Sequence, residues 1–276
     1  MSTDLERALI DFISREGPTP TTELLARLKK STGCSRASFY RELKRLEDEG
    51  AILILESVVH LCHAHFTARR LEQSHTEDAA LQQAEEMMRS VESAPLKWTT
   101  DTLSRVHALW STVALTVLKT LDGAGYVGWS PHPWFHLTNK NLEEQALTAH
   151  FADRHSFTTI IGPSGKLGEA YIDYFKDRGG LVRRVDRIPN NLEGTHLSVI
   201  EDYIIKIQLD TDLHGYLQKL FSNDIHRTEI NSAEKSTLNA MRGTHTIELE
   251  KNPSKAEKIL SLLLRSSVAD SDDSTL

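Results

Sequence analysis

The stretch SRASFYRELKRLEDEG, residues 35–50, gathers side chains that suit binding to a polyanion. Basic residues are concentrated between positions 27 and 45, where the single acid is Glu42, although the whole chain has a formal net charge of -7. Guanidinium and ammonium groups neutralise phosphates, and arginine and serine side chains also bond the edges of bases. The basic residues of this segment are Arg27, Lys29, Lys30, Arg36, Arg41, Lys44 and Arg45. The local charge is therefore opposite in sign to the global one.

The stretch HLCHAH, residues 60–65, could supply metal ligands. Its imidazole and thiol groups, on His60, Cys62, His63 and His65, suit zinc or copper. The alternative, which we favour, is that a strand leaving a hairpin buries a histidine or a small thiol in the core. We therefore expect no metal site.

The glycine-rich stretch GPSGKLG, residues 162–168, follows a predicted strand and precedes a predicted helix, a place where phosphates are often bound. It does not match a Walker loop, because Ile160 stands where a glycine is required and Leu167 replaces the Ser or Thr. A tight turn is the simplest interpretation. The alternative is a weak anion or effector contact that involves Gly162 and Ser164.

Aromatic and imidazole groups are concentrated at residues 129–136, in a stretch that ends with PHPWFH. Trp129, His132, Trp134 and His136 follow a predicted strand, where α/β sheets open toward ligands, so they are candidate effector-binding residues. The alternative is that these aromatic side chains fill the junction between the sheet and the preceding helices. The sequence has no G-x-S-x-G or H-E-x-x-H motif, so we expect no enzyme, no catalytic residue and no cofactor.

The elements that must position the basic residues can be read from apolar periodicity. Residues 4–16 have the i, i+3, i+4 pattern of an amphipathic helix, and a second short helix follows Gly17-Pro18-Thr19-Pro20 and ends near Gly33. Ser35 is a suitable N-cap for a third helix that stops at Gly50. The β-rich runs AILIL and VVHLC, separated by Glu56-Ser57, then predict a hairpin. Three helices and a hairpin form a winged helix.

The third helix separates an apolar stripe from a basic face when it is projected at about 100° per residue. Phe39, Leu43 and Leu46 fall on the stripe. A solvated charged face is the simplest reading of such a helix, but the helix-turn-helix order favours DNA. Ser38 and Arg41 are the best candidates for base edges, and the lysines for phosphates. The residues predicted to contact double-stranded DNA are Arg36, Ser38, Tyr40, Arg41, Lys44 and Arg45, together with Lys29 and Lys30.

Residues 5–62 resemble the winged-helix domains of MarR-type and TrmB-type transcriptional regulators. The resemblance rests on SFYRELKRLEDEGAI, which is similar to their recognition helix and first wing strand. It implies a sequence-specific transcriptional regulator. One departure concerns the wing turn, Glu56-Ser57, which has no Arg or Lys and so puts a minor-groove contact from the wing in doubt.

The middle segment predicts two helices with apolar seams. Leu81, Ala84, Met88 and Val91 are spaced 3, 4, 3, and the same rhythm recurs from Leu103 to Val117. The seams could pack inside the chain, below the C-terminal half. We favour a homodimer interface, because winged-helix proteins usually need two DNA half-sites for affinity and specificity.

The C-terminal half alternates strands and helices in the manner of an α/β domain with a mixed sheet. Strands are predicted at 125–129 and in the runs FTTII and LVRRV, and a hairpin joins HLSVI to YIIKIQL. Helices are predicted at 141–154, 166–178, 213–221 and 253–264. The final residues, SSVADSDDSTL, are too polar to fold.

This order of elements resembles the phospholipase-D-like effector domains attached to TrmB-type regulators. The enzymes of that superfamily use a histidine followed two places later by a lysine. None of the 13 histidines here has lysine at that position, so the resemblance implies a binding domain without catalysis.

Length and composition set the frame for these predictions. The 276 residues are 39% hydrophobic and 26% charged, which is ordinary for a globular protein. The acidic N-terminus does not match a signal peptide, and two cysteines cannot form a disulfide framework, so we expect a cytoplasmic protein.

The predicted class is α+β, with a winged helix at 1–66, a helical connector or dimerisation segment at 67–122, an α/β effector-like domain at 123–265 and a disordered acidic tail at 266–276. The predicted function is a dimeric transcriptional regulator whose C-terminal domain senses a ligand or partner. The alternative is an adaptor or enzyme that uses the winged helix for docking.

Overall fold

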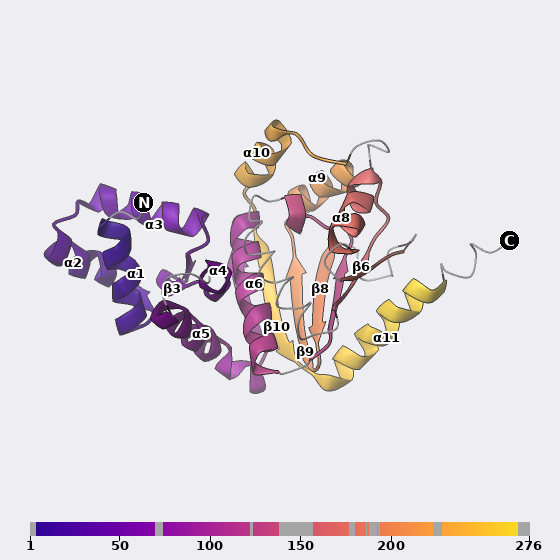
Figure 1. The fold of residues 1–276 in the computed structure, drawn as a ribbon, viewed down its shortest axis with the longest axis horizontal. Helices are drawn as coiled ribbons and strands as arrows, with labels where there is room; N and C mark the ends of the chain where they lie inside the picture. Colours follow the sequence, from indigo (N-terminus) through magenta and orange to yellow (C-terminus); the bar gives the residue numbers. More distant parts are fainter. Residues whose placement is uncertain are drawn as a thin grey trace.

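The structure is a computed structural model, and it describes residues 4–69, 74–121, 124–137, 157–176, 180–185, 187, 192, 194–222 and 228–269. In that part of the chain a small three-stranded sheet lies in an N-terminal helical unit, and a mixed sheet of seven strands forms the larger unit. Figure 1 shows the long helix α6 between the two. The predicted α+β class is confirmed.

The N-terminal unit has the predicted winged-helix order. Its elements are α1 (Asp4–Glu16), β1 (Thr19–Pro20), α2 (Thr21–Thr32), α3 (Arg36–Asp48), β2 (Ile52–Leu55) and β3 (Val58–Leu61). Gly33 and Gly50 have positive φ angles of 70° and 75°, which glycine adopts without strain, and both follow helix ends as expected. The short strand β1 pairs with β3 and was not predicted, because two residues carry no periodic signal.

The core of the winged helix is apolar. Leu9 and Ile13 of α1, Leu24 of α2, and Phe39 and Leu43 of α3 are all 2% exposed or less. These are the positions that the helical periodicity of the sequence places on the inner faces. Burying an aliphatic or aromatic side chain contributes about 1.5–3 kcal/mol, so this cluster supplies most of the unit's stability.

The hairpin of the wing packs on both of its faces. Ile52 and Ile54 belong to the winged-helix core, whereas Leu53 and Leu55 of the same strand pack against the core of the larger unit. Alternate residues of a strand point to opposite faces, so one four-residue strand joins two cores.

Three helices connect the winged helix to the larger unit: α4 (His63–Arg69), α5 (Ser74–Met88) and α6 (Leu103–Thr120). A 3-10 turn, η1 (Arg89–Glu92), extends α5. The buried amide of Gln83 on α5 bridges two earlier elements: it accepts from the Leu61 N–H at 3.0 Å and donates to the Ile13 carbonyl at 3.1 Å. This contact fixes α5 against α1 and the hairpin.

The seven strands of the larger sheet have the order β4-β10-β9-β8-β5-β6-β7 in the described part of the chain. Their bounds are Leu96–Thr100 (β4), His245–Lys251 (β10), Tyr203–Gln208 (β9), Thr195–Ile200 (β8), Tyr126–Ser130 (β5), Phe157–Ile161 (β6) and Leu181–Arg184 (β7). The pairs from β4 to β5 are antiparallel, and β5-β6 and β6-β7 are parallel. The predicted mixed sheet is therefore present.

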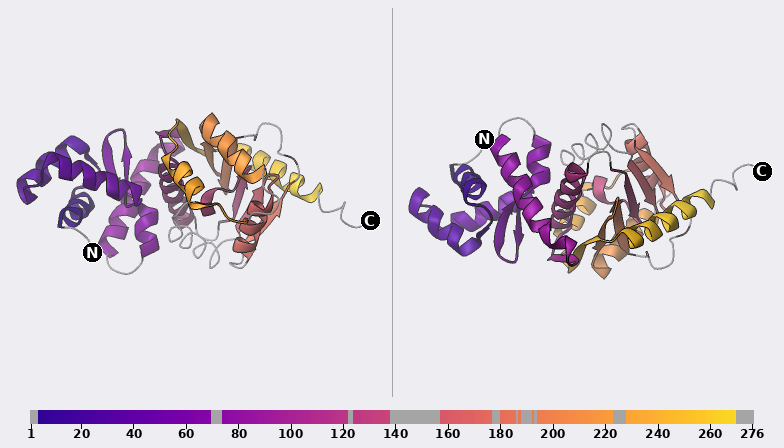
Figure 2. Two further views of the ribbon diagram at one scale, coloured as in Figure 1. Left: turned by 90° about the horizontal axis from the view of Figure 1, so that it is seen from above. Right: turned by 90° about the horizontal axis from the view of Figure 1, so that it is seen from below.

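Helices cover both faces of this sheet (Figures 1 and 2). One face packs against α6, α8 (Lys166–Lys176), α9 (Thr211–Ser222) and α10 (Ser232–Ala240), and the loop after β5 adds the short turn η2 (Phe135–Leu137). The other face packs against α11 (Pro253–Ala269), through Ala256 and Leu263. The described part of the chain has no helix that is long and apolar enough to cross a bilayer.

Several predictions about the boundaries need correction. The helix α11 continues to Ala269, so the predicted polar tail does not begin at residue 266. The strands β4 and β10 and the helix α10 were not predicted. The segment predicted to be a connector contributes β4 and α6 to the larger unit. The helix predicted at 141–154 lies outside the described residues.

The apolar seam of α6 is buried inside the chain. Leu103, Val106, Trp110, Val113 and Val117 are each 7% exposed or less, and they pack in the core that α6 shares with the sheet. For α6 this is the packing inside the chain that we gave as the alternative to a homodimer interface. The seam of α6 is therefore unavailable to a second copy of the chain, and a dimer would need another surface.

Candidate nucleic-acid interface

Local interactions set the orientation of α3. The Ser35 hydroxyl caps the helix by accepting from the Ser38 N–H at 3.1 Å. The predicted stripe of Phe39, Leu43 and Leu46 is buried, with 0%, 2% and 1% exposure. Since these three side chains fill the core, the opposite side of the helix must face solvent.

The first two turns of α3 expose their polar side chains. Arg36, Ser38, Tyr40 and Arg41 are exposed, and the Arg36 guanidinium lies 5.6 Å from the centre of the Tyr40 ring. Within the described residues, neither Arg36 nor Arg41 forms an ion pair with a carboxylate. Their charges are available to an external anion.

Two lysines on α2 extend this surface. Lys29 and Lys30, in the last turn of α2, are exposed, and in the described part of the chain they too form no ion pair. Only the αL turn at Gly33 and two further residues separate α2 from α3. We call Lys29, Lys30, Arg36 and Arg41 the basic face.

Arg45 departs from the prediction. Its guanidinium pairs with Glu42 at 2.7 Å, with Glu6 of α1 at 2.6 Å and with Glu49. The hydrogen bond to Glu42 is the largest influence that raises the pKa of Arg45 further above its ordinary value, against the opposing effect of burial. Three acids of the protein form ion pairs with this guanidinium, and the pair with Glu6 joins α3 to α1. The charge of Arg45 is therefore already neutralised within the protein.

Lys44 is an intermediate case. It is exposed, but its ammonium group lies 2.6 Å from Asp48, one turn further along α3. An exposed pair of this kind is worth only about 0.2–1 kcal/mol and exchanges readily with other partners. The first half of α3 therefore has unpaired cations, whereas the second half neutralises its own.

The wing turn carries no cation and is held close to the body of the unit. Glu56 and Ser57 have φ angles of 50° and 67°. The Ser57 carbonyl accepts two hydrogen bonds from Thr21, from its N–H at 2.9 Å and its hydroxyl at 2.7 Å. The turn is thereby tied to the start of α2, and the acid at Glu56 opposes contact with phosphate.

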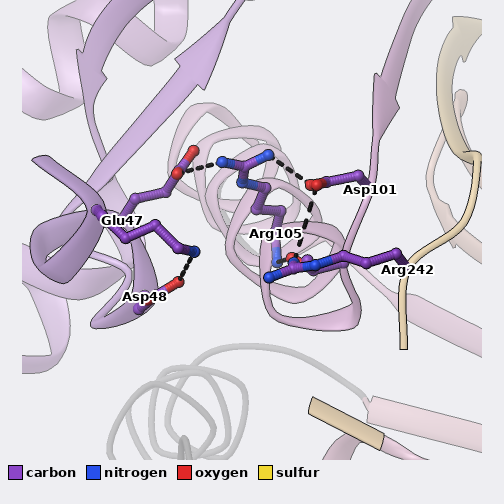
Figure 3. A network of polar contacts seen from close by, with 7 residues as sticks. Glu47, Asp48, Asp101, Arg105 and Arg242 are labelled. Atoms are coloured by element: carbon purple, nitrogen blue, oxygen red, sulfur yellow. Dashed lines mark hydrogen bonds and ion pairs between the residues drawn. The ribbon is translucent and has the colours of Figure 1, made fainter. Parts of the chain in front are cut away.

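The last turn of α3 is joined to the larger unit by an ion-pair network, drawn in Figure 3. Glu47, only 4% exposed, pairs with Arg105 of α6, and Arg105 also pairs with Asp101. Arg242, after α10, lies 3.8 Å from Asp101. Burial raises the pKa of Glu47, and the hydrogen bond from Arg105 opposes that effect. The network connects α3 to both α6 and the α10 region.

The predicted effector residues lie in two places, near the end of β5 and in the turn between β6 and α8. Trp129, His132 and Trp134 are buried near the end of β5, with 1%, 3% and 0% exposure, while the side chain of His136 lies outside the description. His132 stacks on Phe221, with ring centres 5.7 Å apart. Trp134 packs in the core that α6 shares with the sheet, as the alternative interpretation predicted, whereas Trp129 belongs to the apolar cluster that includes Ala256 and Leu263 of α11.

The glycine-rich stretch forms a tight turn whose backbone N–H groups bond to backbone carbonyls of neighbouring segments. The Gly162 N–H bonds to the Ser130 carbonyl at 3.0 Å, and the Gly165 N–H bonds to the Phe221 carbonyl at 3.0 Å. A Cβ at position 162 would lie 2.7 Å from the Pro131 carbonyl oxygen, so glycine is required there. Ser164 packs over Gly168. The Ser164 hydroxyl is buried and has no hydrogen-bond partner within the described residues, so the alternative anion contact at Gly162 and Ser164 stays a prediction.

The histidine and cysteine stretch lies inside the protein. The strand ends at Leu61, so His63 is on α4, where its ring nitrogens lie 3.2 Å from the Thr116 hydroxyl and 3.0 Å from the Lys119 ammonium. The Cys62 thiol lies 3.2 Å from the Thr112 hydroxyl. Among the described residues, no three His, Cys, Asp or Glu side chains are grouped as metal ligands.

A cavity that the sequence did not predict lies in the larger unit. It is lined by fourteen residues, which include Trp129 from the predicted set, together with Trp110, Tyr126, Phe135, Phe157 and His196. The only signal in the sequence was the alternation of aromatic and small residues, Tyr126-Gly128-Ser130 and Phe157-Thr159, on neighbouring strands. Its meaning depends on the strand register, which the sequence did not give.

Comparisons with known proteins do not place the chain in a family. No family model matches the sequence, and no curated protein matches it. A solved structure described as "Structure of TrmBL2, an archaeal chromatin protein, shows a novel mode of DNA binding" aligns over 95% of this chain and 90% of that chain, with 12% identity and a TM-score of 0.32. A likeness at this level carries no argument about fold or function.

Proposed function

We propose that the protein is a DNA-binding transcriptional regulator that uses α3 as its recognition helix. The observation that carries the proposal is the basic face: four exposed cations, Lys29, Lys30, Arg36 and Arg41, that form no ion pair within the described residues. An anionic backbone that neutralises such cations releases counterions, which drives association. Ser38 and Tyr40 are also exposed, and they lie on α3 between Arg36 and Arg41, where they could contact bases.

The roles within this surface follow from position. Arg41, in the middle of the exposed side of α3, is the best candidate for a base edge, because a guanidinium can bond guanine in a bidentate manner. The lysines at the end of α2 suit phosphates, which position the helix without reading sequence. We leave Arg45 out of the proposed contacts, because Glu6, Glu42 and Glu49 occupy it.

We further propose that the larger unit senses a ligand or partner and that α6 communicates the result. Two contacts support this: α6 forms one wall of the sheet's core, and its Arg105 pairs with Glu47 of α3. A ligand changes such an arrangement only by binding its alternatives with different affinity. Dimerisation through a surface other than the α6 seam also remains part of the proposal, because two half-sites raise specificity.

We propose no catalytic role. The resemblance of the larger unit to phospholipase-D-like domains rests on the order of its elements, and the histidine-lysine pairing of that superfamily is missing from the sequence. A binding domain is the corresponding proposal.

The test compares Arg41→Ala with Arg15→Ala as a matched control. Arg15 is also exposed and helical, but it lies on α1 and pairs with Asp11. Duplexes selected from a random pool by the unmodified protein would be titrated by fluorescence anisotropy at several salt concentrations. We expect Arg41→Ala to weaken binding by about 10–100-fold, as for the loss of a base contact of about 1–3 kcal/mol, and Arg15→Ala to have little effect.

Equal binding by the two variants, at every salt concentration, would contradict the proposal. Recovery of no preferred duplex from the pool, with binding that does not depend on salt, would favour the adaptor alternative, in which the winged helix docks on another protein.

A further inference from the structure

The cavity of the larger unit lies between the sheet and two of its helices. Strands β5, β6, β8 and β9 supply its floor, α6 supplies Trp110, and α8 supplies Tyr171 and Phe175. The enclosed space among these groups is small, with room of about 30 Å³ for the centres of water-sized molecules, and it opens in part to solvent.

The strand register explains why the space exists. Gly128 of β5 is paired with Thr159 of β6 and with Ser198 of β8, so three small residues lie side by side on the face that α6 and α8 cover. The Tyr126 ring covers Gly128, since a Cβ there would lie 2.9 Å from that ring. Aromatic side chains therefore surround a floor of small residues, and the small side chains leave an open space above the strands.

Most polar groups of the cavity already have partners. The Ser198 hydroxyl lies 2.9 Å from both the Trp110 indole nitrogen, which donates to it, and the Tyr126 hydroxyl. The Ser130 hydroxyl lies 2.8 Å from Nδ1 of His196. These contacts hold the side chains in place, and they leave few groups to bind a ligand.

His196 is the exception. Its ring is 1% exposed, it lines the cavity, and its Nε2 has no hydrogen-bond partner within the described part of the chain. A buried nitrogen without a partner has lost the hydrogen bond that it would form with water, so a ligand that bonds Nε2 would recover that loss. Since Ser130 holds the opposite ring nitrogen, the orientation of Nε2 is fixed.

The lining offers no counter-charge to an ion. The fourteen lining residues include no Asp, Glu, Lys or Arg. Burial, followed by the nearby His132 and His214, lowers the pKa of His196 well below its ordinary value, so the ring is neutral at physiological pH. An unpaired charge moved into such surroundings would be strongly disfavoured.

We propose that this cavity binds an uncharged, mainly aromatic small molecule that forms one hydrogen bond with Nε2 of His196. Flat rings suit walls made of Trp110, Phe135 and Phe157, which pack against ring faces and edges. The binding itself does not depend on DNA. Its role as an effector rests on the proposed function, because Trp110 and Arg105, the residue that contacts α3, lie five positions apart on α6.

The first test compares matched probes on the full chain without DNA. Indole and 2-naphthol would be titrated by isothermal calorimetry beside indole-3-acetate and naphthalene-2-sulfonate, which add a charge to the same ring systems. We expect saturable binding of one molecule of the uncharged probes per chain, and at least about tenfold weaker binding of the charged ones. Failure of both uncharged probes to bind, or equally tight binding of the charged ones, would overturn the proposal.

The second test uses His196→Leu, with His245→Leu as its control. His245 is also buried, also has an Nε2 atom without a partner in the described part, and lies on β10 outside the cavity lining. We expect His196→Leu to weaken the binding of 2-naphthol about tenfold and His245→Leu to leave it unchanged. Equal losses in both variants would overturn the site assignment.

If His196→Leu does not fold, the probe comparison on the unmodified protein still decides the question. A positive probe result with no DNA binding would refute the proposed regulator and leave the cavity proposal standing, so the two failures can be distinguished.

Discussion

The winged helix and the larger unit place their polar groups in opposite ways. The winged helix has an apolar core and keeps cations such as Arg36 and Arg41 at its surface. The larger unit buries imidazole and hydroxyl groups beside a cavity, and several of their atoms, such as Nε2 of His196, lack a partner in the described residues. The first arrangement suits an anion that arrives from outside, and the second suits an uncharged molecule that is enclosed.

The buried imidazoles of the larger unit must stay neutral in the folded state. We therefore expect the largest effect on its stability at low pH. Burial, and then the nearby His214, lower the pKa of His132 to about 4. The unfolded chain binds a proton near the ordinary value of about 6.5, so His132 contributes stability above pH 6.5 that is lost as the pH falls toward 4. The shift corresponds to about 3 kcal/mol in the free energy of unfolding.

Substitution of His132 by Phe should remove that contribution. The ring would still stack on Phe221, but it could not take up a proton. Urea denaturation at pH 7.5, 6 and 5 would give the free energy of unfolding of both proteins. We expect the unmodified protein to lose about 2 kcal/mol more than His132→Phe between pH 7.5 and pH 5, since the full loss is reached only below pH 4. Parallel curves would show that the buried imidazole is not the sensitive group.

The contact between the two units gives the next largest effect. Arg105→Met removes the cation beside Glu47, whose carboxylate is almost fully buried. We expect a loss of about 2–3 kcal/mol at pH 7.5, which is the cost of leaving a buried charge without its partner. Chemical denaturation would measure it.

The same variant has a pH signature with the opposite sign. The folded-state pKa of Glu47 is already raised by burial, and loss of Arg105 should raise it further. The folded state then binds the proton more tightly than the unfolded state, so the variant should regain stability as the pH falls below neutrality. The double variant Glu47→Gln with Arg105→Met should lack this recovery. Recovery in the double variant would assign the effect to another group.

The smallest effect on stability is expected at Arg45 of α3, and it distinguishes this residue from Arg41 on the same helix. Arg45→Ala removes the ion pairs with Glu6 and Glu42, and we expect a loss of about 1 kcal/mol in stability, as for a partly exposed network. DNA affinity should change less than threefold at a temperature where the variant is folded. Arg41→Ala should show the reverse: unchanged stability and weakened binding. Similar behaviour of the two variants would remove the distinction between the halves of α3.

Local signals allowed much of the fold to be predicted. The apolar spacing in α1 and α3, the cap at Ser35 and the glycines after the helices determine the winged helix over short distances. The hairpin of β8 and β9 was also found, because its β-rich runs adjoin a short turn at Glu201. Each of these features depends on residues a few positions apart.

The features that were missed depend on long-range pairing. Arg45 reaches Glu6 across 39 positions, and this contact decides whether its charge is available. The cavity requires Gly128, Thr159 and Ser198 to be adjacent, which only the sheet register accomplishes. The strand β10 carries a modest alternation, and its partners β4 and β9 are distant in the sequence.

The hairpin that packs against two cores limits how the chain can be divided. A fragment that ended after residue 66 would keep the winged-helix elements, but it would expose Leu53 and Leu55, which the larger unit now covers. The fragment would therefore be prone to self-association, and measurements of DNA affinity on it would be distorted by aggregates. Expression of the winged helix alone would require polar substitutions on the outer side of β2.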